Sequence, residues 1–105
     1  MTFVAALKDM GVPVAATRPS PRAIVDDDVW RQAILGIAAG EATLLSLWSD
    51  GEAVHMGVID GATGDIAVVS LPCPDRRFPS VARTHPPALR LERTIRDLYG
   101  LEPED

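Results

Sequence analysis

The charged and aromatic side chains that could most readily bind a partner or take part in chemistry lie near the C-terminal end of the chain, at helical spacing. They are Glu92, Arg93, Arg96, Asp97 and Tyr99. In a helix Glu92 would neighbour Arg96, and Arg93 would neighbour Asp97, and each such exposed pair stabilises a helix by about 0.3 kcal/mol. The planar guanidinium of Arg93 could also clamp carboxylates or backbone carbonyls across an interface. Spacing alone favours a solvated helix face with ion pairs.

The remaining candidates for chemistry are few. Cys73 is the single cysteine, so the chain can form no internal disulfide and no thiolate pair for nickel, iron or an iron–sulfur cluster. His55 and His85 have no acid or cysteine at motif spacing, which is typical of packed or surface histidines. The run Asp26-Asp27-Asp28 could attract a cation, but capping of a following helix explains it more simply. We therefore expect no catalytic, metal-binding or cofactor-binding residues in this chain.

The N-terminal region, residues 1–22, is predicted to be a short helix followed by a proline-rich connector. Apolar residues recur at helical spacing from Phe3 to Met10, and Gly11 provides a stop. The connector covers Thr17–Arg22, where Pro19 and Pro21 each remove a backbone donor, and we expect it to be poorly ordered.

A short strand at residues 23–25 and a longer helix are expected next. The helix should run from about Val29 to Ala39 and end at Gly40, after the three aspartates. Its buried stripe has the spacing i, i+3, i+4, i+7, i+8 and consists of Trp30, Ala33, Ile34, Ile37 and Ala38.

Three strands are predicted in the middle of the chain, forming an antiparallel meander. The runs Thr43–Ser49 and Ala53–Ile59 flank Asp50-Gly51, a dipeptide typical of a type I′ hairpin turn, and a third run covers Asp65–Leu71. The glycines around these runs do not form the Gly-x-Gly-x-x-Gly pattern of a dinucleotide site and are interpreted as turn glycines. We expect Trp30 and Trp48 in the core.

The C-terminal segment is predicted to be a helix over Pro87–Tyr99, with a short helical turn opening at Phe78-Pro79 before it. One side of this helix should be apolar and packed, and comprises Ala88, Leu91, Ile95, Leu98 and Tyr99. Arg90, Arg93 and Asp97 fall on the opposite side, and Glu92 falls at the border between the two sides, with Arg96.

Composition and charge fit one folded domain spanning residues 1–105. The predicted elements make it an α+β domain with an antiparallel sheet, built of the three-strand meander and a short extra strand. Helices cover one face of this sheet, and a helical segment forms the C-terminal part. A chain of 105 residues is the usual size for one domain. The formal net charge of −5 repels a phosphate backbone and so argues against nucleic acid as a partner. No apolar run is long enough for a membrane helix, and the start lacks the pattern of a signal peptide. We therefore expect a cytoplasmic protein.

The last third of the chain resembles a known family. The residues that carry the resemblance are Phe78-Pro79-Ser80-Val81, Pro86-Pro87-Ala88, Glu92-Arg93 and Asp97-Leu98-Tyr99-Gly100-Leu101. They resemble the C-subunit family of NADH:quinone oxidoreductase (complex I). They resemble even more closely a related domain, the N-terminal domain of the large subunit of formate-hydrogenlyase-type membrane-bound [NiFe] hydrogenases. Thr94 stands where the complex I pattern has a second glutamate, and that pattern's downstream histidine and arginine are not found here, so the hydrogenase-type domain is favoured.

The resemblance implies a structural or docking component of an electron-transport complex, either a hydrogenase or a respiratory NADH dehydrogenase, without catalytic residues or cofactors of its own. Its partners would be the catalytic large subunit and neighbouring iron–sulfur subunits. It would lie at the cytoplasmic face of the cell membrane and reach the membrane only through them. In this interpretation Glu92, Arg93, Arg96, Asp97 and Tyr99 fix the C-terminal helix against the domain or a partner. Two alternatives stay open: a whole subunit or a domain of a longer polypeptide, and a stand-alone protein- or ligand-binding module outside any redox complex.

Overall fold

The computed structural model describes residues 3–14 and 22–104, and it has an α+β fold, as expected. The elements in chain order are α1 (Phe3–Met10), β1 (Val12–Val14), β2 (Arg22–Ile24), α2 (Asp27–Ala38), β3 (Ala42–Ser49), β4 (Ala53–Asp60), β5 (Ile66–Pro72), β6 (Arg77–Pro79), the 3₁₀ helix η1 (Pro86–Ala88), α3 (Leu89–Tyr99) and β7 (Glu102–Glu104). The predicted proline-rich connector lies, apart from Arg22, outside the described residues.

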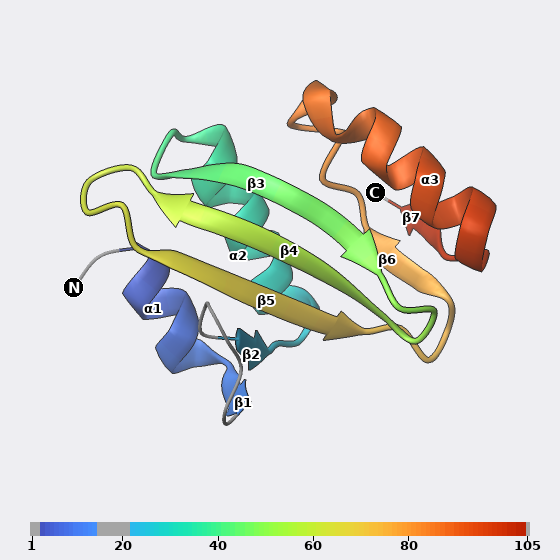
Figure 1. Ribbon diagram of the computed structural model, residues 1–105, viewed down its shortest axis with the longest axis horizontal. Coiled ribbons are helices and arrows are strands. Elements are labelled where there is room, and N and C mark those ends of the chain that lie inside the picture. Colours follow the sequence, from blue (N-terminus) through green and yellow to red (C-terminus); the bar gives the residue numbers. More distant parts are fainter. Residues whose placement is uncertain (1–2, 15–21, 105) are drawn as a thin grey trace.

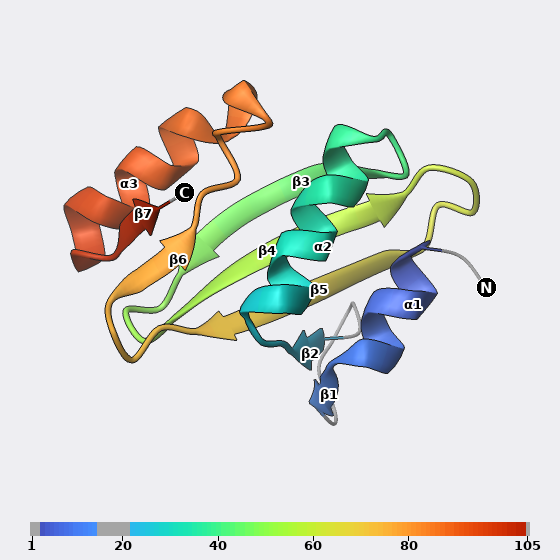
Figure 2. The same ribbon diagram turned by 180° about the vertical axis from the view of Figure 1, so that it is seen from behind.

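The main sheet has five strands in the order β1-β2-β5-β4-β3. The predicted meander β3-β4-β5 is confirmed and forms its antiparallel part. The predicted extra strand is β2, which pairs in parallel with β5, so the sheet as a whole is mixed. Helices α1 and α2 cover one face of this sheet, and the other face carries no helix (Figures 1 and 2).

The core lies between the sheet and helix α2. Asp26 caps α2, because its side chain accepts a hydrogen bond of 2.9 Å from the backbone N–H of Val29. The buried helix side chains are Val29, Trp30, Ala33, Ile34 and Ile37, whereas Ala38, predicted to be in this stripe, is exposed. On the facing strand β4, Val54, Met56 and Val58 are fully buried. The apolar stripe of α2 and the inward-facing side chains of β4 thus pack against each other in one apolar layer.

The hairpin β3-β4 forms where the sequence predicts it, but its turn is of a different type. A type I′ turn at Asp50-Gly51 would need positive φ at both residues. Gly51 has φ +95°, but Asp50 does not have a positive φ; among the described non-glycine residues only Arg76 does. The Asp50 carboxylate instead accepts hydrogen bonds from the backbone N–H groups of Glu52 and Ala53, at 2.9 and 3.0 Å, and so closes the turn with its side chain.

The segment 77–104 packs beside β3, the edge strand of the main sheet (Figure 1). Phe78 and Pro79, predicted to open a helical turn, instead belong to strand β6, which pairs in parallel with β7. The 3₁₀ helix η1 leads directly into α3, and Gly100, with φ +69°, ends α3 in the left-handed conformation. Helix α3 lies against β3 and is framed by β6 and β7. This unit is attached to the core by the Trp30 indole, which donates a 3.0 Å hydrogen bond from Nε1 to the carbonyl oxygen of Pro79.

Candidate functional site

The candidate site is the C-terminal helix α3 together with the loop that precedes it. Ala88 and Ile95 are buried beneath the helix, and Leu91 is partly buried. Leu98 and Tyr99, which were predicted on the packed side, are 68% and 37% exposed. They lie in the last turn, where the chain bends away at Gly100 toward β7, so the end of the helix has less of the domain beneath it.

Glu92 occupies the inner side of α3 and is only 2% exposed. Its carboxylate accepts hydrogen bonds from the hydroxyl of Ser80 at 2.8 Å, from the backbone N–H of Val81 at 2.5 Å, and from the backbone N–H of Ala82 at 3.2 Å. A carboxylate that accepts several N–H and O–H bonds is strongly held, since charge-assisted bonds are about twice as strong as neutral ones. Glu92 therefore fixes α3 to the Ser80–Ala82 loop of its own domain.

The ion pairs predicted from i, i+4 spacing do not form among the described residues. The Glu92 carboxylate faces the loop, and Arg96 contacts Asp97 instead, with 3.7 Å between Nε and Oδ1. No Arg93–Asp97 bridge forms, and an arginine placed four residues before an acid is the weaker orientation of such a pair. The spacing argument failed for Glu92 because long-range hydrogen bonds to buried donors outweigh an exposed pair.

The outer side of α3 is exposed and mainly basic. Arg90, Arg93, Arg96 and Asp97 all point into solvent, and Leu89 lies among them with 54% of its surface exposed. The helical wheel placed Arg90 on the same side as Arg93, but neither Arg90 nor Leu89 was among the predicted interface residues.

Tyr99 links α3 to two other loops. Its carbonyl oxygen accepts a hydrogen bond from the guanidinium of Arg76. Its ring lies over the β3-β4 turn, where a Cβ added at Gly51 would be 3.4 Å from Tyr99 Cδ1. Of the five predicted interface residues, four are thus exposed on α3, and Glu92 is inside. Their contact with another subunit stays a prediction.

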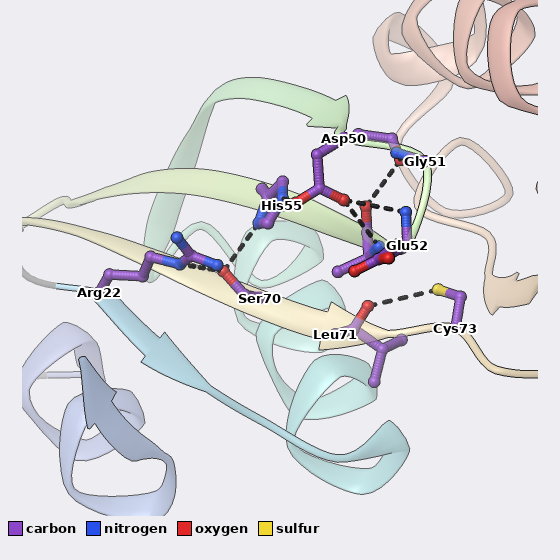
Figure 3. Close-up of polar contacts among 10 residues, drawn as sticks. Arg22, Asp50, Gly51, Glu52, His55, Ser70, Leu71 and Cys73 are labelled. Atoms are coloured by element: carbon purple, nitrogen blue, oxygen red, sulfur yellow. Dashed lines mark hydrogen bonds and ion pairs between the residues drawn. The ribbon is translucent and has the colours of Figure 1, made fainter.

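A second polar cluster crosses the helix-free face of the sheet and was not predicted (Figure 3). Arg22 Nε donates to Ser70 Oγ at 2.8 Å, Ser70 Oγ lies 2.8 Å from His55 Nδ1, and His55 Nε2 lies 3.2 Å from Asp50 Oδ2. A neutral His55 with its proton on Nε2 satisfies every contact, since Nε2 then donates to the carboxylate and Nδ1 accepts from the serine hydroxyl. The pairing of His55 opposite Ser70 in the meander is the signal that could have indicated this cluster.

The cluster has the residue types of an acyl-transfer triad but not the access. Ser70 is 1% exposed and His55 4% exposed, so a substrate carbonyl cannot reach the serine oxygen. Burial lowers the pKa of His55, against the opposing effect of Asp50, and this keeps the imidazole neutral near pH 7. Hydrogen bonds from the backbone of Ala53 and Glu52 hold the pKa of Asp50 at about 2. The cluster is a structural bridge between β2, β4, β5 and the hairpin turn.

The structure also shows the surroundings of Cys73 and Trp48, which the sequence analysis singled out. Cys73 is buried, its thiol donates to the carbonyl oxygen of Leu71 at 3.3 Å, and burial raises its pKa. Trp48, predicted in the core, is 41% exposed on the helix-free sheet face, where its ring centroid lies 5.5 Å from that of His55. Within residues 3–14 and 22–104, no group of three or more histidine, cysteine or acidic side chains is placed to hold a metal ion. In the same residues, every helix is too short or too polar to cross a membrane.

Comparison with known proteins gives a likeness in structure only. No family model matches the chain, and no curated protein matches it. Among solved structures, the trypsin-resistant fragment of Nqo5 is 20% identical with a TM-score of 0.72, over 95% of this chain and 90% of that one. A chain of the membrane-bound sulfane sulfur reductase, an archaeal respiratory membrane complex, is 17% identical with a TM-score of 0.65, over 96% of this chain and 68% of that one. The protein therefore has the same fold as these two chains.

Proposed function

We propose that this chain is a non-catalytic structural component of a respiratory or hydrogenase-type membrane complex, related to complex I, and that it docks on the catalytic large subunit. The observation that carries the proposal is the likeness of nearly the whole chain to Nqo5, a complex I subunit, and to a chain of a respiratory membrane complex. The residues that resemble the complex I C-subunit pattern are those that build the α3 unit, which adds support from the sequence.

The docking surface in this proposal is the exposed side of α3. Glu92 holds the helix from inside, and Arg93, Arg96 and Asp97 then face outward toward the partner. Tyr99, whose ring lies over the β3-β4 turn, contributes only its exposed part. Because Glu92 fixes the helix before a partner binds, the helix loses little conformational entropy on binding. The finer assignment, to the N-terminal domain of a formate-hydrogenlyase-type hydrogenase large subunit, rests on the sequence pattern and belongs to the same proposal. So does its position at the cytoplasmic side of the membrane.

The test is co-isolation from the native cells. The tagged chain should be recovered with a large subunit that carries paired cysteines and with iron–sulfur subunits, identified by mass spectrometry and by nickel and iron content. Arg93→Ala and Tyr99→Ala should lower the recovery of these subunits several-fold, whereas Arg77→Ala, at an exposed arginine of β6, should not. Recovery of the wild-type chain as a monomer without any redox subunit would contradict the proposal.

A second candidate function is a stand-alone binding module that uses its sheet. The observation that favours it is the sheet face that carries no helix (Figure 1). In the strand register Trp48 and Ile66 lie on the same side as His55 and Ser70, and they are 41% and 39% exposed. Exposed apolar groups on one face are typical of a contact surface for another molecule. A monomeric chain whose Trp48 fluorescence responds to an added ligand, without any redox partner, would support this candidate over the first.

A further inference from the structure

A shallow pocket lies at the beginning of α3, where the double proline turns into the helix. Its volume is about 570 Å³, and it is lined by Pro86, Pro87, Leu89, Arg90, Leu91 and Arg93. Four of the lining residues, the two prolines and the two leucines, are apolar. The other two are arginines three residues apart, which makes them neighbours on the helix surface. A lining of apolar residues with a few charged groups is typical of a site for a specific ligand or side chain.

The two pocket arginines are not used by the fold. Among the described residues, neither the Arg90 nor the Arg93 side chain takes part in a hydrogen bond or ion pair. The chain has 15 acidic and 10 basic residues, so acidic groups are available for pairing elsewhere in the molecule. The one other acid within α3 besides Asp97 is Glu92, which is buried and directed at the loop. An outward basic surface thus stands on a protein of negative net charge.

The geometry favours a protein segment over a lipid surface as the occupant. Leu89 and Leu98 are nine residues apart, which places them on opposite sides of a helix that advances about 100° per residue. The exposed side of α3 therefore lacks the continuous apolar stripe of a membrane-surface helix. Planar guanidinium groups beside a small apolar pocket suit carboxylates that flank an apolar side chain.

We propose that this pocket binds an acidic segment of a partner protein, whose carboxylates pair with Arg90 and Arg93 and whose apolar side chain packs on Leu89 and the double proline. The inference rests on the proposed function, since it names what the partner subunit presents to the N-terminal half of α3. It assigns positions Leu89 and Arg90 to the interface in addition to the residues that the sequence pattern selects.

The test uses isotope-labelled full-length chain and two synthetic peptides, acetylated Glu-Glu-Leu-Glu-Glu and its match Gln-Gln-Leu-Gln-Gln, followed by NMR titration at low salt. The acidic peptide should shift the signals of Leu89 to Arg93 and the side-chain Nε–H signals of both arginines. Arg90→Gln and Arg93→Gln should each weaken binding roughly fivefold, and the double variant more, because each removes a partly exposed charge-assisted contact. Arg77→Gln, which removes the same charge from an exposed arginine outside the pocket, should leave binding unchanged.

Several outcomes would overturn the inference. They are equal binding of both peptides, retention of acidic-peptide binding in the double variant, and equal occupation of the pocket by inorganic phosphate. Binding to phosphatidylglycerol vesicles without peptide binding would identify a lipid surface instead. Melting curves of the Arg90 and Arg93 variants should match the wild type, since these two side chains make no hydrogen bond or ion pair within the described part of the chain. Failure of the peptide test together with intact co-isolation of redox subunits refutes only this inference. Peptide binding without co-isolation refutes the proposed function.

Discussion

Replacement of Glu92 gives the sharpest test of how α3 is held. In Glu92→Ala the backbone N–H of Val81, a fully buried residue, loses its partner at 2.5 Å, and the partly buried Ser80 and Ala82 lose theirs. A buried donor without a partner costs about 1–3 kcal/mol, and the two partly buried donors, which water can reach, add about 1 kcal/mol together. We expect the free energy of unfolding to fall by about 3 kcal/mol, a large part of the roughly 5–15 kcal/mol of an ordinary domain.

The matched variants separate the hydrogen bonds from the helix itself. Glu92→Gln keeps the shape and one acceptor oxygen, so we expect a loss of about 1–2 kcal/mol. Glu102→Gln, at an exposed position of β7, should change stability by less than about 0.5 kcal/mol. Urea unfolding followed by tryptophan fluorescence measures all three, because Trp30 is buried and bonded to Pro79 in the same region. If Glu92→Ala costs no more than Glu102→Gln, the carboxylate does not hold α3, and the reasoning is wrong.

Four further tests concern His55, Asp50, Gly36 and Cys73. Burial lowers the pKa of His55 in the folded chain, so below about pH 6.5 the unfolded chain binds a proton at His55 that the folded chain does not. The free energy of unfolding should therefore decrease as pH falls from 6.5 to the folded pKa. In His55→Gln the urea midpoint should no longer depend on pH in this range. Asp50, with its pKa at about 2 in the folded state against 3.8, should add a second loss only between those two values. Gly36→Ala should destabilise α1 packing by about 1–3 kcal/mol, because a Cβ there would overlap the Phe3 ring; an unchanged melting temperature would contradict this contact. Cys73 should react with a thiol reagent only on unfolding, and prompt labelling of the native protein would show that the thiol is accessible.

The elements that follow from local signals could be predicted from the sequence. The cap at Asp26 and the apolar stripe from Trp30 determine α2, and the β3-β4 hairpin follows from two strand patterns around a turn dipeptide. These signals lie within one element or one turn, so the residues that decide the structure are close together in the sequence.

The features that depend on long-range partners could not be predicted. Glu92 is at the border of the helix wheel, and only the position of the Ser80–Ala82 loop, ten to twelve residues earlier, determines that it is buried. Trp48 is exposed because no helix covers its face of the sheet, which no pattern in β3 itself reveals. In the same way, the parallel pairing of β6 with β7 depends on the route of the chain through α3.

That pairing has a consequence for the kinetics of assembly. Strands β6 and β7 precede and follow α3 in the chain and pair with each other, and Ser80 N–H donates to the carbonyl oxygen of Glu104, so both ends of the α3 segment are tied to one small ladder. A partner would therefore bind a preformed surface, and folding of this segment would not be a step in binding. We expect the association rate to be limited by collision and orientation, to rise as ionic strength falls if the partner is acidic, and to follow single-exponential kinetics.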